Sequence, residues 1–138
     1  MKIGVIGNGY VGGAIAHGFS PASTGTCEVK VHDIIPERSL NTLEDTVNDS
    51  DFVFVSVPTP MNKNGSISLK LIDDAFKQIN GVNRRSDNII ILKSTVIPGS
   101  TEKLQEKFPN LNIVFNPEFL TEKSARLDFI NQTRIVLG

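Results

Sequence analysis

The stretch Gly7-Asn8-Gly9-Tyr10-Val11-Gly12 decides how this chain folds. It follows a short apolar run, Lys2–Ile6, and opens an amphipathic stretch with a helical period that continues to Phe19. In a G-x-G-x-x-G loop the first glycine allows a tight turn, and the second lets a pyrophosphate approach the backbone. The third lets the helix pack closely on the strand. Strand, glycine loop and helix in this order predict a βαβ unit that binds a dinucleotide.

A carboxylate stands where such a unit needs one. The next apolar run, Val29–Asp33, ends in an acid about 20 residues after the last glycine, where it can hold the hydroxyls of an adenosine ribose. A carboxylate there repels a 2′-phosphate, which favours NAD over NADP. Arg38 lies further along the chain, and we set it aside as a phosphate partner. The alternative is a plain strand–helix turn followed by an incidental loop acid.

Short runs rich in Val and Ile alternate with amphipathic stretches along the whole chain. The runs predict six buried strands, at Lys2–Ile6, Val29–Asp33, Phe52–Val57, Ile89–Lys93, Asn112–Phe115 and Ile135–Leu137. Helices are predicted between them, at 11–19, behind an Asn41 cap with Glu44 as its third residue, at 69–79 behind a Ser68 cap, at 101–108 and at 121–129. This alternation predicts one α/β domain over residues 1–138. Its fold class is a Rossmann-like, doubly wound, parallel six-stranded sheet in three layers.

Composition narrows the class of protein. The 138 residues carry 14 Lys and Arg against 15 Asp and Glu, a net charge of −1 without a basic run, which argues against a nucleic-acid partner. No apolar stretch reaches the ~18 residues of a membrane span. The first residues are too quickly interrupted by glycine for a secretory signal. The single cysteine, Cys27, forms no internal disulfide, which fits a cytoplasmic location. We expect no metal site.

Unusual residues follow the other predicted strands. Val57-Pro58-Thr59-Pro60 makes a stiff loop, Lys93-Ser94-Thr95 places two hydroxyls at a strand end, and Asn116-Pro117-Glu118 follows the fifth strand with Glu122 one helical turn later. Ligands of open α/β sheets bind outside the carboxyl ends of the strands, so these segments are candidates for the site.

Structural interpretations of the same residues stay open. Asn116, Pro117 and Glu118 also suit the cap and first turn of a helix. Ser94 and Thr95 could serve only to bond loop backbone groups.

The combined segments resemble the UDP-glucose/GDP-mannose dehydrogenase family over its N-terminal NAD-binding domain. The resemblance rests on GxGYVG at Gly7–Gly12, VPTP at Val57–Pro60, KSTVIPGST at Lys93–Thr101, NPEFL at Asn116–Leu120 and RIVLG at Arg134–Gly138. It implies oxidation of the C6 hydroxyl of a nucleotide sugar to a carboxylate. The family uses two NAD for this, through a thioester on a cysteine.

The resemblance also implies roles for single residues. The implied NAD contacts are Gly7, Asn8, Gly9, Tyr10, Val11, Gly12, Asp33, Val57, Pro58, Thr59, Ser94 and Thr95. The implied catalytic residues are Thr95, which helps to hold a water, Glu118 as a general acid/base, and Glu122 as a second glutamate. Thr121-Glu122-Lys123 departs from the Arg-Glu-Gly that the family often has at these positions.

The family's nucleophilic cysteine belongs to a later segment that this sequence does not contain. Cys27, expected at the opposite edge of the sheet, cannot replace it. Three hypotheses follow. The first is the NAD-binding domain of a nucleotide-sugar dehydrogenase, which would bind the sugar together with a further domain or partner chain. The second is an autonomous NAD-binding module, and the third is a small dehydrogenase for another alcohol. An apolar patch left uncovered would favour self-association.

Overall fold

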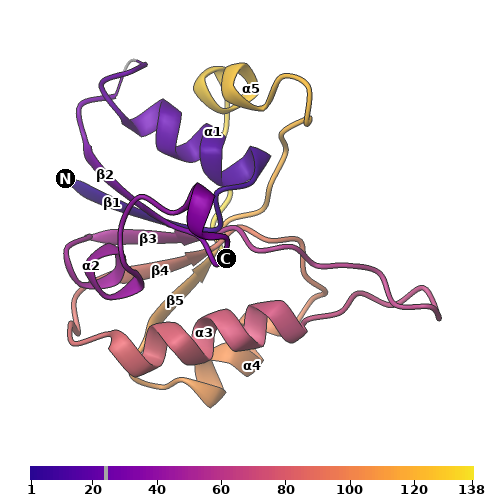
Figure 1. The fold of residues 1–138 in the computed structure, drawn as a ribbon. Helices are drawn as coiled ribbons and strands as arrows, with labels where there is room; N and C mark the ends of the chain where they lie inside the picture. The colour runs from indigo at the N-terminus through magenta and orange to yellow at the C-terminus, as the bar shows by residue number, and fades with distance from the viewer. Residues whose placement is uncertain (24) are drawn as a thin grey trace.

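The chain folds into three layers around a parallel sheet, as seen in the computed structural model, which describes residues 1–23 and 25–138 (Figure 1). Its strands are β1 Lys2–Ile6, β2 Glu28–His32, β3 Phe52–Val55, β4 Ile89–Leu92 and β5 Asn112–Phe115. They lie in the order β2-β1-β3-β4-β5 and every neighbouring pair is parallel. The predicted Rossmann-like, doubly wound α/β fold is confirmed, and its direction of winding reverses beside β1.

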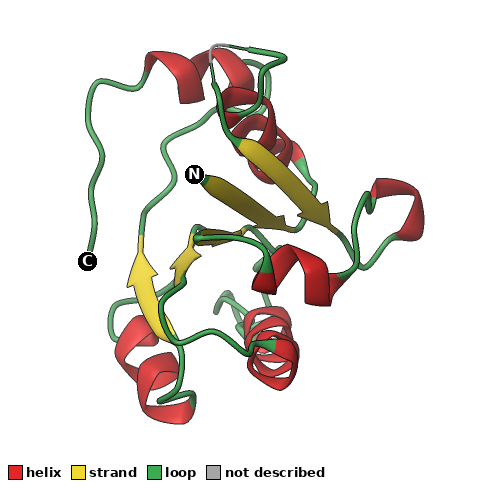
Figure 2. Cartoon of the chain, turned by 90° about the vertical axis from the view of Figure 1, so that its left-hand side faces the viewer, coloured by secondary structure: helices red, strands yellow, loops and turns green. Residues whose placement is uncertain are grey.

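The predicted sixth strand is wrong. The sheet has five strands, and residues 135–137 form none of them. The chain returns to the end of β5 in the opposite direction, where Gly138 and Phe115 exchange both backbone hydrogen bonds, at 2.6 and 2.9 Å, an antiparallel pattern (Figure 2). Ile135 and Leu137 stay 69% and 64% exposed. These apolar side chains are not buried in a core, so the segment gains nothing from joining the sheet as a sixth strand.

Helices cover both faces of the sheet. They are α1 Tyr10–Phe19, the short 3₁₀ turn η1 Pro36–Arg38, α2 Leu43–Asn48, α3 Lys70–Val82, α4 Ser100–Lys107 and α5 Ala125–Asn131. α1 and α5 lie together on one face, and α3 and α4 lie on the other (Figure 1). Within the described ranges, the chain offers no helix of the length and apolarity that a bilayer crossing requires.

Two predicted helix caps are wrong. α2 is capped by Thr42, whose hydroxyl accepts a hydrogen bond from the Asp45 N–H at 3.1 Å, one residue later than predicted. The Asn41 side chain instead accepts a hydrogen bond from the Val31 N–H of β2 at 2.9 Å. Because its oxygen bonds to this strand, it does not cap the helix. α3 begins after Leu69 and has no side-chain cap, so Ser68 does not serve as one.

α5 begins four residues later than predicted. Asp128 collects the Thr121 N–H, the Thr121 hydroxyl and the Ser124 hydroxyl on one carboxylate oxygen, at 2.8–2.9 Å. These hydrogen bonds lower the pKa of the Asp128 carboxyl below its ordinary value. They also hold residues 121–124 as a turn ahead of the helix, where the helical period alone predicted continuous helix.

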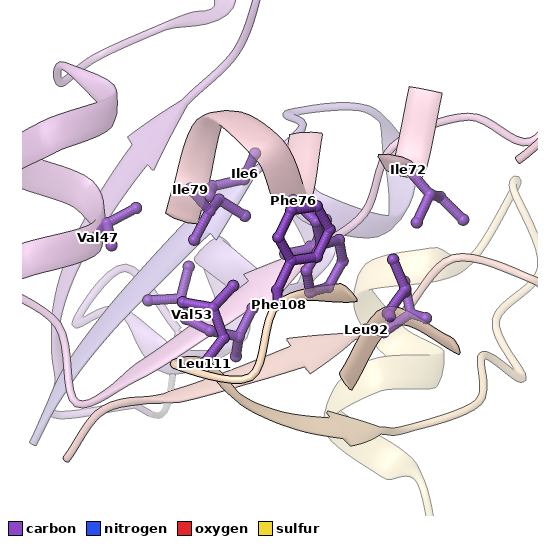
Figure 3. Close-up of a cluster of buried hydrophobic side chains, with 12 residues drawn as sticks. Ile6, Val47, Val53, Ile72, Phe76, Ile79, Leu92, Phe108 and Leu111 are labelled. Carbon is purple, nitrogen blue, oxygen red and sulfur yellow. The ribbon is translucent and has the colours of Figure 1, made fainter. Parts of the chain in front are cut away.

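The two faces of the sheet have separate cores. The first joins β1, β3 and β4 to α2, α3 and α4, with Phe76 of α3 stacked on Phe108 at 6.4 Å between ring centroids (Figure 3). In the second, Phe19 contacts Phe54 and Phe129. Cys27 is buried in this second core, just before β2. It therefore lies at the amino edge of the sheet, as expected, and packs as a small apolar side chain.

The backbone hydrogen bonds of the parallel sheet continue for one residue beyond the ends of β1, β3, β4 and β5. The N–H groups of Gly7, Ser56, Lys93 and Asn116 donate to carbonyls of the neighbouring strands, at 2.8–3.0 Å. The four segments that follow are therefore fixed side by side at the carboxyl edge of the sheet.

Phe76→Ala should lower the free energy of unfolding by about 3–5 kcal/mol, since it leaves a cavity in the first core. Urea unfolding measures this loss. The matched change Lys77→Ala, on the exposed side of the same helix, should stay within about 0.5 kcal/mol. Equal losses for both variants would contradict the described core.

Candidate functional site

The glycine loop is held by two close backbone approaches. Gly7 has a φ of +91°, and a Cβ there would lie 2.5 Å from the Ser56 carbonyl oxygen. A Cβ at Gly12 would lie 1.8 Å from the Gly7 carbonyl oxygen, far inside van der Waals contact. Only glycine fits at these two positions, and with glycine there α1 begins after a loop of only three residues, 7–9.

Gly9 differs from its two neighbours in the motif. A Cβ there would meet no described atom within 4 Å, and the φ of −80° suits any residue. Packing therefore does not require glycine at this position. Gly9 is the N-cap of α1, where the first helical N–H groups have no partner within the helix and the helix dipole favours an anion. The open space in front of these groups suits a pyrophosphate.

Asp33 joins the end of β2 to the glycine loop. One carboxylate oxygen accepts the Asn8 N–H at 2.6 Å, and the other accepts the Ile35 N–H at 2.8 Å. The Asn8 side chain in turn donates to the Arg38 carbonyl at 2.8 Å. A carboxylate accepts more than two hydrogen bonds, so Asp33 retains capacity for ribose hydroxyls. The loop after β2, with Arg38 in it, thus lies against the phosphate loop.

Two adjoining cavities follow the carboxyl edge of the sheet. One, of about 550 Å³, contains Gly7 and Asp33, together with residues of α3. The other, of about 330 Å³, is lined by Gly9, Tyr10, Val11, Ser56, Val57, Pro58, Thr59, Lys93, Ser94, Thr95 and Glu118. Val57 and Pro58 line both cavities. These two adjoining cavities, here called the crevice, have Asp33 at one end and Thr95 and Glu118 at the other.

The two hydroxyls after β4 have different surroundings. Ser94 is buried and donates to the Val57 carbonyl at 2.7 Å, so it ties the end of β4 to the proline-rich loop, as its structural interpretation proposed. Thr95 is exposed and lines the smaller cavity, where its hydroxyl can reach a ligand.

A buried lysine organises the segment after β5. The Lys93 ammonium contacts Asn116 Oδ1 at 3.0 Å, the Pro117 carbonyl at 3.3 Å and Glu118 Oε2 at 3.3 Å. No helix forms here, so the interpretation of these residues as a cap and first turn is wrong. Burial lowers the pKa of the Lys93 ammonium, and the Glu118 carboxylate partly opposes that shift. Glu118 also accepts the Leu120 N–H at 2.7 Å.

Glu122 lies apart from the other two predicted catalytic residues. It lines a third cavity of about 320 Å³, between the start of α1 and residues 122–127, with Gly9 and Tyr10 on the opposite wall. Thr95 and Glu118 share the smaller crevice cavity, and Glu122 is not among its lining residues. The structure thus brings two of the three predicted catalytic residues together.

Lys93 and Ser56 are site residues to which sequence reasoning assigned no role. A lysine at the end of an otherwise apolar strand is a weak signal, because it fits an exposed strand end equally well. Within the described ranges, no three His, Cys, Asp or Glu side chains are grouped to hold a metal ion.

Residues 35–138 match the UDP-glucose/GDP-mannose dehydrogenase family, NAD binding domain. The chain belongs to this family. The matched stretch begins just after Asp33, and full-length relatives extend the similarity over the glycine loop.

Two relatives illustrate the similarity. UDP-glucose 6-dehydrogenase AglM of Haloferax volcanii is 30% identical and covers all of this chain, which spans 41% of that protein. UDP-glucose 6-dehydrogenase YwqF of Bacillus subtilis is 32% identical, again over the whole chain and 39% of its own length. The chain therefore spans about two fifths of the length of these two relatives.

The fold is shared with solved members of the family. A GDP-mannose dehydrogenase from Pseudomonas aeruginosa, solved as a ternary complex, superposes on all of this chain with a TM-score of 0.82 at 24% identity. The chain covers 41% of that structure.

Gly9→Ala and Gly12→Ala should separate binding from folding. Gly9→Ala should weaken NAD binding by roughly tenfold or more, because its methyl group displaces a charge-assisted phosphate contact. Its stability should change by less than about 1 kcal/mol. Gly12→Ala should lose at least about 1–3 kcal/mol of stability through the clash with Gly7. Calorimetric titration and urea unfolding measure the two quantities, and a Gly9→Ala protein with unchanged affinity would contradict the assignment.

Proposed function

We propose that this chain is the NAD-holding part of a nucleotide-sugar 6-dehydrogenase that oxidises a sugar C6 hydroxyl to a carboxylate with two NAD. Family membership supports NAD as the ligand. The observation that carries the proposal is the pair of adjoining cavities: Asp33 lies in one, Thr95 and Glu118 lie in the next, and the glycine loop contributes to both. A dinucleotide lying along this edge would present its nicotinamide to Thr95 and Glu118.

Each residue has a defined task in this proposal. Asp33 accepts the ribose hydroxyls and disfavours a 2′-phosphate, while the N–H groups at the start of α1 bind the pyrophosphate. NAD, when bound, supplies the hydride acceptor. Thr95 holds a water by its exposed hydroxyl. Glu118 takes a proton from that water, a role we assign to it because it lines the same cavity as Thr95.

The substrate side of the reaction needs groups from outside this chain. Relatives named as UDP-glucose 6-dehydrogenases are more than twice as long as the part matched here. Cys27, the single cysteine, is buried in the second core at the amino edge of the sheet and cannot serve as a nucleophile at the crevice. We therefore assign the thiol and most of the nucleotide-sugar pocket to a further domain or a partner chain.

Asp33→Asn should weaken NAD binding more than Cys27→Ser does, and it should raise the affinity for NADP relative to NAD. The amide keeps an acceptor for the Asn8 or Ile35 N–H but removes the charge that repels a 2′-phosphate. Calorimetric titration with both dinucleotides measures the ratio. An unchanged ratio would reject the ribose assignment, even if both affinities fell.

The chain alone should produce no NADH from UDP-glucose or GDP-mannose, although the same preparation binds NAD by calorimetry. Formation of NADH is followed by its absorbance over hours, with a complete family member as the positive control. Turnover of a nucleotide sugar by the pure chain would contradict the division of labour proposed here. Turnover of a simpler alcohol would favour a small dehydrogenase instead.

A further inference from the structure

We propose that the Lys93–Glu118 ion pair sets the preference of this site between oxidised and reduced NAD, an inference that rests on the proposed function. The pair would distinguish the two forms by the charge of the nicotinamide ring. Glu118 attracts a cationic nicotinamide, and Lys93, behind it, limits that attraction.

The two charges are built into the site at different depths. The Lys93 side chain is 3% exposed and its ammonium is surrounded by three acceptors from residues 116–118. The Glu118 side chain is 11% exposed, and its second oxygen is fixed by the Leu120 N–H. Both side chains have partners on two sides, so neither can turn away from the other without breaking hydrogen bonds.

These two residues carry the charge of their cavity. Its other lining residues are glycine, tyrosine, valine, proline, serine and threonine, all uncharged at neutral pH. In a cavity with partly apolar walls, a buried charge acts on a ligand with little screening. Removing either partner changes the net charge of the cavity by one unit, in opposite directions.

The pair lies where the nicotinamide end of a dinucleotide, rather than its adenosine end, would be beside the two charges. Asp33 lies in the neighbouring cavity, across Val57 and Pro58, so the adenosine end of a dinucleotide is directed away from Lys93 and Glu118. The nicotinamide end therefore faces the pair. Its ring carries a positive charge when oxidised and none when reduced, so a charge beside it discriminates between the two forms.

A site that binds the oxidised form and releases the reduced form must hold neither too tightly. An unpaired Glu118 would overbind the cation, and an unpaired Lys93 would repel it. Burial lowers the pKa of the Lys93 ammonium, and the Glu118 carboxylate opposes that shift. Each charge thus affects the other inside the cavity.

Affinities of NAD⁺ and NADH for single variants test the proposal. Lys93→Met should shift the ratio of affinities towards NAD⁺, and Glu118→Gln should shift it towards NADH. Even with the screening of water, unit charges a few ångströms apart interact by about RT, so each shift should be about threefold or more. The double variant should return close to the wild-type ratio. Lys103→Met and Glu106→Gln make the same charge changes on the exposed side of α4 and should leave the ratio unchanged.

The ratio separates electrostatics from structural damage, because a loosened site loses affinity for both forms alike. Ratios that stay unchanged, or that move in the same direction in both single variants, would overturn the proposal. Failure of the wild-type chain to bind either form would overturn the proposed function and this inference with it.

If Lys93→Met does not fold, Glu118→Gln and its control Glu106→Gln still test the proposal. A ratio that shifts towards NADH in Glu118→Gln but not in Glu106→Gln supports it, and an equal ratio in the two variants would overturn it.

Discussion

The close contact between Gly7 and Gly12 is the constraint on which the site depends. Because Gly12 has no Cβ, the first turn of α1 can pack against the Gly7 carbonyl and begin after a loop of only three residues, 7–9. This places the start of the helix, whose first N–H groups have no partner within the helix, at the carboxyl edge of the sheet and at the point where the winding reverses. Gly9 is then left open in front of the helix, as a place for an anion.

The rest of the edge is aligned by strand-end contacts of the same kind. Backbone N–H groups one residue beyond β1, β3, β4 and β5 continue the parallel ladder. Side chains then lock the loops together: Ser94 holds the proline-rich loop, and Lys93 holds residues 116–118. The crevice is therefore built on the sheet edge, and its two ends have distinct chemistry, with the Asp33 carboxylate at one and an ion pair at the other.

Sequence reasoning predicted the features that depend on local geometry and failed where tertiary contacts decide. The glycine loop, Asp33 at the end of β2 and the parallel order all follow from spacing and alternation. The sixth strand was wrong because Ile135–Leu137 meets no core, and the helical interpretation of Asn116–Glu118 was wrong because Lys93 takes those polar groups. A buried lysine and its partners lie far apart in the chain, so no local pattern indicates them.

In the proposed function, NAD lies along this one crevice. Titration of the ¹⁵N-labelled chain with NAD, followed by amide NMR, tests it most directly. We predict that the perturbed amides fall in residues 7–12, at Asp33, and in residues 57–59, 93–95 and 118, while amides around Cys27 remain unchanged. The absence of any perturbation at millimolar NAD, or perturbations confined to the amino edge of the sheet, would contradict the account.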